Sequence, residues 1–503
     1  MKKQYFLYLF MGLFSTMFFT SCKKDKIAPA NQHTAFVKYY GHVLDQEGHD
    51  VKVLTTEEGA TEYLILGSSK SFGSLALGRA FRDMYLIKTD SLGNEIWSRK
   101  FGNDTGDQTA ELRTDEDDDE EYDEEYDEVG KRLLVLKDGS GYLLAGTRTR
   151  YVTNENNQWV SVDKKIILYQ VDTDGEKVKS HVHDYIGWSE NEEKPCCSEE
   201  LYDIVELDPE VEASLGSTAG KFVIAGSTTR VDRTKPDFEE EGGNDKKDIF
   251  AVKLDENFET LWSRAYGFVR EDNGVSILVL SNSYAVAGTV KIPQGSSSFV
   301  NAYTLVEYNK SSGNVINTQE YESGGIAQSA CWDDLNQIIT IFGTVDDENL
   351  KIVQASENFD EIGKHDVSLN PNGNHGYKTS GPKTASDIVL LPGKEGYLLS
   401  ATTKADIDIR DVKDAEGNPE KITGAETIHM IKLDSKFNTQ QERIMGYGKS
   451  SAAGRIALIE KLEAGATTAT ALGYVLTGTF DIGTNAMVGL VRTNTDLSFN
   501  SDE

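Results

Sequence analysis

Four aspartates late in the chain have the type and spacing of a loose cation site. Asp406, Asp408, Asp411 and Asp414 are separated by apolar and basic residues within the segment Thr402–Thr427. Ca²⁺ prefers several oxygen ligands, and alternating carboxylates with a nearby glycine can supply them. The EF-hand spacing is not met, because the glycine comes late and no glutamate closes the loop. We expect a long loop here, with Ca²⁺ binding as one hypothesis and a plain solvated loop as the other.

A denser carboxylate cluster runs from Asp115 to Glu128. It has 12 carboxylates in 14 residues, and only Tyr122 and Tyr126 interrupt it. Self-repulsion keeps such a run extended and solvated. We therefore predict a disordered, solubilising loop, and the alternatives are weak Ca²⁺ binding and docking to a basic partner.

Two further pairs of side chains could bind a metal or form a disulfide. His181 and His183 lie on one face of a predicted strand, but the sequence locates no third ligand for zinc, so we expect ordinary surface histidines. Cys196 and Cys197 are adjacent in the chain. Three states are open for them: a vicinal disulfide, two free thiols, or a bridge from one of them to Cys331. A vicinal disulfide would form a rigid apolar platform beside a ligand.

Several aromatic residues lie in or beside long connections, outside the repeated pattern described below. They are Tyr151, Trp159, Trp188, Phe238 and Phe299. Exposed aromatic rings can stack on sugars or become buried in a protein partner. Our candidates for a binding face are Tyr151, Trp159, Trp188 and Phe238, together with Cys196 and Cys197. The alternative is that the rings cover the small cores of their own loops.

Motifs for catalysis are missing from the sequence. It contains no nucleophile elbow, phosphate-binding loop, dinucleotide fingerprint or zinc motif, so we predict no catalytic residue and no cofactor besides Ca²⁺. Carboxylate pairs for glycoside hydrolysis can be formed by residues distant in sequence, and they remain an alternative. The formal net charge of −32 argues against nucleic acid as a partner, because phosphates require Lys and Arg.

The elements that must hold these residues are short strands, since helical periodicity is nearly absent. One strand type reads Gly-Tyr, then apolar residues, then Ala-Gly-Thr/Ser. Its seven copies begin at Tyr63, Gly141, Lys221, Tyr284, Gln337, Gly396 and Gly473. A second type, such as Asp248–Asp255, follows each copy, and a third ends in Trp-x-x-x-Tyr/Phe-Gly. A fourth precedes the Gly-Tyr strand, as at Leu133–Leu136, Ile204–Leu207, Ile388–Leu391 and Ile456–Ile459.

Four antiparallel strands in each of seven units predict an all-β fold, a seven-bladed β-propeller. A blade cannot bury both of its faces alone, so the units must pack on one another in a ring. The last unit lacks its outer strand, whereas Phe36–Gly41 is an outer-strand sequence with no blade before it. We therefore predict that strand 36–41 closes the last blade, and that residues 35–503 form a single domain.

The segment Asp248–Gly267 carries the pattern Asp-Ile-Phe-x-x-Lys-x-Asp, a turn, and Trp-x-x-x-Tyr-Gly, and Asp83–Gly102 follows the same pattern with Met-Tyr after the first Asp and Phe before the last Gly. This pattern resembles the repeats of secreted bacterial β-propellers, which are often cell-surface lipoproteins. The resemblance covers residues 36 to about 495 and implies the fold more strongly than a function.

The long connections predict one elaborated face. They join the Gly-Tyr strand to the next strand, as in the predicted loops Thr147–Lys164, Thr289–Asn301 and Thr402–Thr427, or they join one blade to the next. In an up-down blade both kinds emerge on the same side. By contrast, the inner strands show no conspicuous polar departure of the kind that a central catalytic site would require. Three or more carboxylates, His or Arg converging at the axis would favour an enzyme.

The N-terminus predicts delivery to a membrane. Lys2 and Lys3 precede the apolar stretch Tyr5–Phe19, which is typical of a signal peptide. The sequence Phe19-Thr20-Ser21-Cys22 resembles a bacterial lipobox, which implies cleavage after residue 21 and acylation of Cys22 with fatty acids such as palmitate. Residues 22–34 would then be a flexible tether. The alternative is a plain secretory signal.

These observations lead to one functional hypothesis and one alternative. The first is a lipoprotein of the outer membrane of a Gram-negative bacterium, exposed at the cell surface, that acts as a binding or accessory subunit for a protein or glycan. The second is an extracytoplasmic propeller enzyme, a glycan hydrolase or lyase.

Overall fold

The computed structural model describes residues 35–499, with gaps at 57–58, 73–74, 77, 103–123, 155, 184–197, 216–218, 230–246, 268–270, 295–297, 370–376, 414–418, 447–449, 463–465, 467 and 484. The predicted signal peptide and tether, including Cys22, lie outside the described residues. Ala35–Glu503 forms one compact unit. Within the described part, no helix is long and apolar enough to cross a bilayer.

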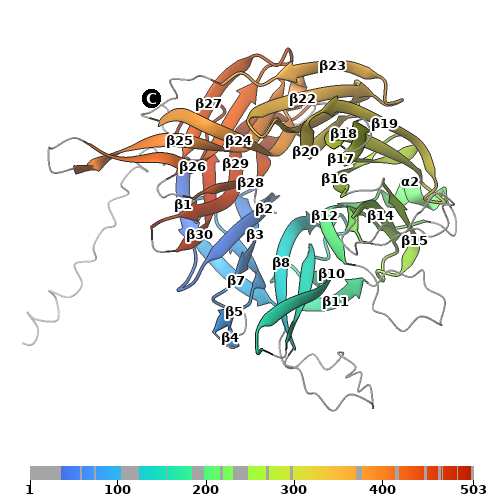
Figure 1. Ribbon diagram of the computed structural model, residues 1–503, viewed down its shortest axis with the longest axis horizontal. Helices are drawn as coiled ribbons and strands as arrows, with labels where there is room; N and C mark the ends of the chain where they lie inside the picture. Colours follow the sequence, from blue (N-terminus) through green and yellow to red (C-terminus); the bar gives the residue numbers. More distant parts are fainter. Residues whose placement is uncertain are drawn as a thin grey trace, which may run out of the picture. The chain divides into compact units, whose positions relative to one another are not determined.

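Seven four-stranded antiparallel sheets are arranged around a common axis (Figure 1), which confirms the seven-bladed propeller. Blade one contains β2 (Gln46–Thr55), β3 (Thr61–Ser69), β6 (Asp83–Thr89) and β7 (Glu95–Phe101). Blade two contains β8 (Glu124–Val135), β9 (Tyr142–Thr153), β10 (Trp159–Val171) and β11 (Lys177–His183). Blade three contains β12 (Glu199–Glu206), β13 (Phe222–Thr228), β14 (Asp248–Leu254) and β15 (Thr260–Tyr266). Blade four contains β16 (Asn273–Val279), β17 (Ser283–Gln294), β18 (Ser298–Asn309) and β19 (Val315–Ser323). Blade five contains β20 (Gly325–Asp333), β21 (Ile338–Val345), β22 (Asn349–Ser356) and β23 (Glu361–Asp366). Blade six contains β24 (Tyr377–Leu390), β25 (Tyr397–Lys413), β26 (Pro419–Leu433) and β27 (Thr439–Met445). Blade seven contains β28 (Ala452–Lys461), β29 (Thr470–Asp481), β30 (Ala486–Thr493) and β1 (Phe36–Tyr40).

The ring closes through the N-terminal strand, as the sequence predicts. Strand β1 pairs antiparallel with β30, in a register that runs from Phe36 opposite Arg492 to Tyr40 opposite Val488. The last blade therefore combines three C-terminal strands with one N-terminal strand, as predicted. This pairing covers a sheet edge that would otherwise be open.

The Ala-Gly-Thr/Ser motif now has a structural explanation. Its hydroxyl accepts a hydrogen bond from a backbone N–H of the inner strand in the next blade. The pairs are Ser68 with Gly130, Thr147 with Leu201, Thr289 with Ala327, Thr344 with Ala385, Thr402 with Ala453 and Thr479 with Gly48, at 2.9–3.2 Å. Each bond satisfies a donor that the interface between two blades would otherwise bury. We call these contacts the hydroxyl clamps.

The glycine before the clamp is required by close packing within the blade. A Cβ on Gly146 would lie 2.2 Å from the carbonyl oxygen of Val129, and one on Gly343 would lie 2.2 Å from that of Ile326. Both oxygens belong to the neighbouring inner strand. Only glycine allows the two backbones to come this close without displacement.

The apolar core lies between blades. Leu64 and Leu66 of blade one belong to the same buried cluster as Leu144 and Ile167 of blade two, and the other clusters repeat this arrangement. Packing of each sheet on the next therefore buries both faces of each blade, as the repeat predicts.

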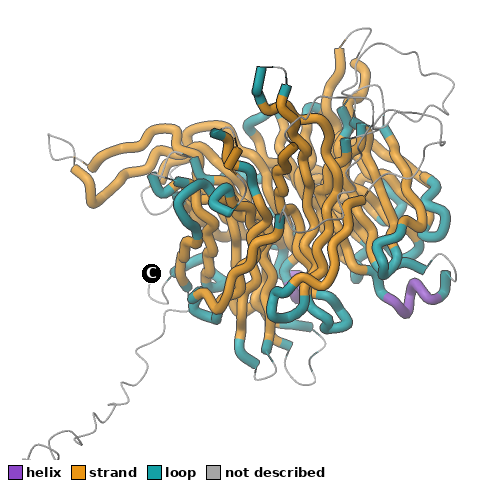
Figure 2. The backbone as a smooth tube through the Cα atoms, turned by 90° about the horizontal axis from the view of Figure 1, so that it is seen from below, coloured by secondary structure: helices purple, strands orange, loops and turns teal. Residues whose placement is uncertain are grey.

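Three of the predicted long loops are wrong, because the chain continues there as paired strands. The described residues of segments 147–164, 289–301 and 402–427 belong to the extended hairpins β9–β10, β17–β18 and β25–β26. Alternating polar and apolar residues allow these segments to keep their ladder hydrogen bonds beyond the ring. All three join the second and third strands of a blade, so they lie on one face. Figure 2 shows the long β25–β26 hairpin on the opposite side of the ring from the short helix α2 (Pro209–Ala213).

Candidate functional site

The inner strand of every blade contains a β-bulge. The ladder shifts between Gly48 and Asp50 in β2, and equivalent shifts occur in the other six inner strands. A bulge leaves one residue without a cross-strand partner and re-aims its side chain. The extra residues are His49, Lys131, Tyr202, Val275, Gln328, Ser386 and Gly454, one from each blade.

These seven residues line one cavity of about 460 Å³, which we call the axial cavity. Since every blade contributes one residue, the cavity lies on the propeller axis. Its other walls include Glu47, Ser450 and Thr479, which lie at or beside the start of an inner strand or toward the end of a second strand. Both of these ends face the side with the extended hairpins. The axial cavity is therefore on the elaborated face.

The residue after the bulge has a structural role. In blades one, three and six it is Asp50, Asp203 or Asp387, whose carboxylate accepts the backbone N–H of Leu133, Ile277 or Ile456 in the next blade, each at 2.9 Å. Ser276 accepts the N–H of Ala330 in the same way, at 3.0 Å. These buried side chains join neighbouring blades around the axis.

Arginine occupies this position in blades two and seven. Arg132 donates to Asp203 at 2.7 Å, and Arg455 donates to Asp387 at 2.5 Å and to Ser329 at 3.0 Å. Burial opposes the charge of Asp387, but Arg455 and Arg132 outweigh it and hold its pKa below the usual value. The expectation of inner strands without polar departures was therefore wrong.

Three side chains from consecutive blades give the axial cavity its chemistry. Burial, together with the charges of Lys131 and Arg82, lowers the pKa of His49, so its imidazole is neutral at pH 7. Burial also lowers the pKa of Lys131, although Glu200 and Glu47 oppose the shift. Tyr202 donates to Glu200 at 2.8 Å. The cavity thus combines an imidazole, an ammonium and a phenol on one side.

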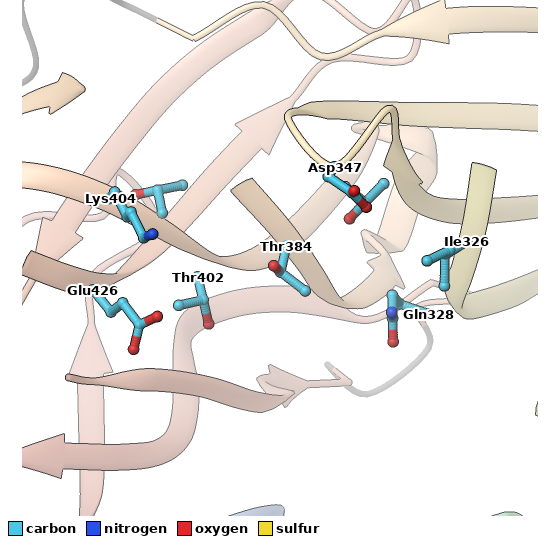
Figure 3. A pocket seen from close by; sticks show the side chains of 9 residues that line it. Ile326, Gln328, Asp347, Thr384, Thr402, Lys404 and Glu426 are labelled. Atoms are coloured by element: carbon cyan, nitrogen blue, oxygen red, sulfur yellow. The ribbon is translucent and has the colours of Figure 1, made fainter. Parts of the chain in front are cut away.

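The opposite side is neutral and leads to a second cavity. Val275, Gln328 and Ser386 carry no charge, and Gln328 also lines a space of about 340 Å³ between blades five and six. Figure 3 shows Gln328, Thr384 and Thr402 around this space, with Lys404 and Glu426 at one end. We call it the threonine cavity, because four of its nine lining residues are threonines.

The structure favours the alternative interpretation for Tyr151 and Trp159. Both are half-buried, and their rings contact the fully buried Phe81 at centroid distances of 5.6 and 5.1 Å. Trp159 also donates to the carbonyl of Ala76 at 3.2 Å, while the guanidinium of Arg79 lies 3.8 Å from the Tyr151 ring centroid. The two rings cover a small core beside the hairpin of β4 (Leu75–Ala76) and β5 (Arg79–Ala80).

Other predicted site residues lie on strands or outside the described residues. Asp406, Asp408 and Asp411 belong to β25, and Asp406 accepts the N–H of Gly424 at 3.0 Å. Asp414, Trp188, Phe238, Cys196 and Cys197 fall in the gaps. No group of three or more possible metal ligands occurs among the described residues, and Ca²⁺ at the four aspartates stays a prediction.

The end of the acidic run is ordered, contrary to expectation. Residues Glu124–Glu128 begin β8, and Asp127 pairs with Arg79 at 3.0 Å while accepting the N–H of Arg82 at 2.7 Å. Glu128 is fully buried and pairs with Arg148 at 2.6 Å. These two carboxylates stabilise the domain and are not available to a partner; residues 115–123 lie outside the described part.

Two smaller expectations also need correction. His183, the last residue of the outer strand β11, is 1% exposed, so it is not a surface histidine. Its ring packs beside Phe250 of blade three. Cys331 is a free thiol on β20, which argues against the long-range bridge. Burial raises the pKa of this thiol, so it is not a reactive thiolate at pH 7.

Sequence reasoning missed the axial cavity, although a signal for it exists. Each bulge reads as an uncharged residue, a variable residue and then Asp, Arg or Ser: Gly-His-Asp, Gly-Lys-Arg, Leu-Tyr-Asp, Gly-Val-Ser, Ala-Gln-Ser, Ala-Ser-Asp and Ala-Gly-Arg. The bulge breaks the two-residue alternation that marks a strand. The inner strands were therefore predicted only from the residues beyond it.

Comparison with known proteins adds only general likenesses of fold. No family model and no curated protein matches the chain. A protein of unknown function from Dyadobacter fermentans is 9% identical, with a TM-score of 0.39, over 91% of this chain and 97% of that one. A DUF4221 member from Bacteroides vulgatus is 10% identical, with a TM-score of 0.33, over 74% and 99%.

A sialidase from Trypanosoma rangeli is 8% identical, with a TM-score of 0.35, over 91% of this chain and 56% of the sialidase. None of these similarities is strong enough to carry an argument about function. The function must therefore be argued from the residues of this chain.

Proposed function

We propose that the protein is a lipid-anchored binding subunit of the outer envelope of a Gram-negative bacterium. Its elaborated face would hold a protein or glycan partner at the axial cavity, and Cys22 would carry the lipid. The observation that carries the binding role is the diversity of the seven bulge residues. They occupy one structural position in seven repeats, yet they are seven different residue types.

The neighbouring position shows what the fold alone requires. The residue after the bulge is only Asp, Ser or Arg, and most of these side chains bond to the next blade. The bulge position has no such restriction, and its side chains face the cavity. Because a uniform scaffold does not require His, Lys, Tyr and Gln there, we assign that variety to recognition of a ligand.

The anchoring part of the proposal rests on the sequence. The apolar stretch Tyr5–Phe19 is followed directly by Ser21 and Cys22. We expect labelled palmitate to be incorporated into the wild-type protein and not into Cys22→Ser. Protease treatment of intact cells should degrade the propeller if the anchor is in the outer leaflet. Labelling that persists in Cys22→Ser would contradict the proposed anchor.

The binding role is tested by mild detergent extraction and affinity purification. We expect a defined partner to co-purify with the wild type and to be lost from the triple variant Lys131→Ala, Tyr202→Ala, Gln328→Ala. The matched control is Lys137→Ala, Lys221→Ala, since both lysines line a cavity at the end of the inner strands that faces away from the hairpins. A partner retained by the triple variant would contradict binding at the axial cavity.

A second candidate function is a glycan hydrolase or lyase. The observation in its favour is that Glu47, His49 and Arg455 converge on the axial cavity, which meets the criterion given above for an enzyme. Lys131 and Tyr202 line the same cavity, and a neutral imidazole and a phenol can act as a base and an acid. The three aspartates near the axis do not add to this case, since each accepts a backbone N–H. Turnover of a glycan by the purified protein, abolished in His49→Ala, would favour the enzyme.

A further inference from the structure

Lys131 differs from the other cations around the axial cavity. Arg132 pairs with Asp203, Arg455 with Asp387, and Arg82 with Glu47 at 2.8 Å. Lys164 and Lys247 both pair with Glu200. Within the described part of the chain, the ammonium of Lys131 makes no ion pair or hydrogen bond, although it lines the cavity. A desolvated cation without a partner is costly to the folded protein unless a ligand pairs with it.

We infer that the axial cavity binds a carboxylated sugar, with the ammonium of Lys131 pairing with the carboxylate. This inference rests on the proposed function of the cavity as a binding site and names its ligand class. The first argument is charge: the neighbouring cations are already neutralised by carboxylates, and Lys131 is not. A ligand carboxylate would supply the missing partner.

The surroundings of Lys131 favour a monoanion over a dianion. Glu47 and Glu200 act on Lys131 from the adjacent blades and raise its affinity for a proton. Arg82 and Lys164 act in the opposite direction and pair with these two carboxylates, so the single ammonium of Lys131 is left to match one negative charge on a ligand. A singly charged carboxylate therefore fits this position better than a phosphate, whose charge at pH 7 approaches two.

The rest of the lining indicates a hydroxylated ligand. Away from Lys131 the wall contains Gln328 and Ser386, both half-buried, and Gln328 also lines the threonine cavity, where Thr384 and Lys404 lie (Figure 3). Amides and hydroxyls both donate and accept, as the hydroxyls of a sugar require. The volumes of the axial and threonine cavities, about 460 and 340 Å³, each lie within the range of small-ligand sites.

The experiment compares two ligands that differ at one group, a carboxylate in one and an uncharged hydroxymethyl in the other. Full-length protein in detergent is titrated calorimetrically with a glucuronate-terminated disaccharide and with its carboxyl-reduced counterpart. We expect the reduced sugar to bind at least about tenfold more weakly, as expected for one charge-assisted hydrogen bond. Lys131→Gln should weaken binding of the acidic sugar by a similar factor and leave the affinity for the reduced sugar unchanged. Lys131→Arg should restore part of the affinity, and Lys137→Gln should behave as the wild type.

Each other result overturns the inference. Equal affinity for the acidic and reduced sugars, or no measurable binding of either, removes the carboxylated sugar as ligand. Inorganic phosphate or a glutamate-containing dipeptide that binds as tightly as the acidic sugar removes the stated selectivity. The proposed binding role stands apart from these outcomes, because it is judged by loss of the co-purified partner in the triple variant.

Discussion

The Oγ1 of Thr479 accepts a hydrogen bond from the backbone N–H of Gly48 at 3.2 Å, across 431 residues of sequence. The same hydroxyl clamp joins most pairs of neighbouring blades, and this copy joins the last blade to the first. The β1–β30 pairing, by contrast, completes the last blade itself. The two contacts together make the ring continuous, and the axial cavity depends on that continuity because every blade supplies one wall residue.

The closing strand gives the first prediction. Removing residues 35–42 should lower the free energy of unfolding by on the order of 5 kcal/mol, because β1 partly buries Phe36, Val37 and Tyr39 and covers the edge of β30. Thermal unfolding of residues 35–503 and 43–503, followed by circular dichroism, measures the effect. An unchanged melting temperature would show that the closure does not stabilise the ring.

The hydroxyl clamps give the second prediction. Thr344→Val keeps the shape of the side chain but leaves the N–H of Ala385 without its acceptor, so we expect a loss of about 1–3 kcal/mol. Thr384→Val is the control, since Thr384 is exposed on the wall of the threonine cavity. Urea denaturation of the three proteins provides the measurement. Equal stability of Thr344→Val and Thr384→Val would argue against the clamp.

Asp387 provides the third prediction, which concerns pH. Its pKa is lowered in the folded protein, so its contribution to stability is fully present above the unfolded value of about 3.9 and is lost as pH falls through the lower, folded value. Asp387→Asn should cost about 3–5 kcal/mol at pH 7, because Arg455 loses its buried partner. The difference between wild type and variant should shrink below pH 4.

Guanidinium denaturation at several pH values between 3 and 7 tests this expectation. Asp366→Asn serves as the matched control, since the Asp366 side chain is 78% exposed in its ion pair with Lys351. A constant difference between wild type and Asp387→Asn over the whole range would contradict the assigned pKa direction.

A buried ion pair within blade three, to which a tyrosine of blade four also bonds, gives the fourth prediction. Lys253 is 0% exposed and pairs with Glu212 of α2 at 2.6 Å, and Tyr284 donates to the same carboxylate at 2.7 Å. Glu212→Ala should cost about 3–5 kcal/mol, because Lys253 is left as a buried charge without its partner. Adding Lys253→Met should recover part of this loss, since the uncompensated charge is then removed. Chemical denaturation of the single and double variants tests the coupling; additive effects would contradict it.

The sequence by itself determined the number of blades, the order of strands within them and the closure by Phe36–Gly41. Those features follow from local rules, since strand alternation, turn glycines and the Ala-Gly-Thr/Ser motif recur in each unit. The clamp hydroxyls were visible as part of that motif, although their partners in the next blade were not.

Only the tertiary structure decided where the candidate site lies. His49, Lys131, Tyr202 and Gln328 are far apart in the chain, and each sits on a bulge that breaks the strand pattern used to find it. Ring closure brings these bulges to one axis. Strand pairing within blade two and packing against blade one place Asp127 and Glu128, which the sequence presents as part of a solvated run, in buried ion pairs. Periodicity reports which residues face a core, but a site formed by one residue from each of seven blades exists only after the blades have closed.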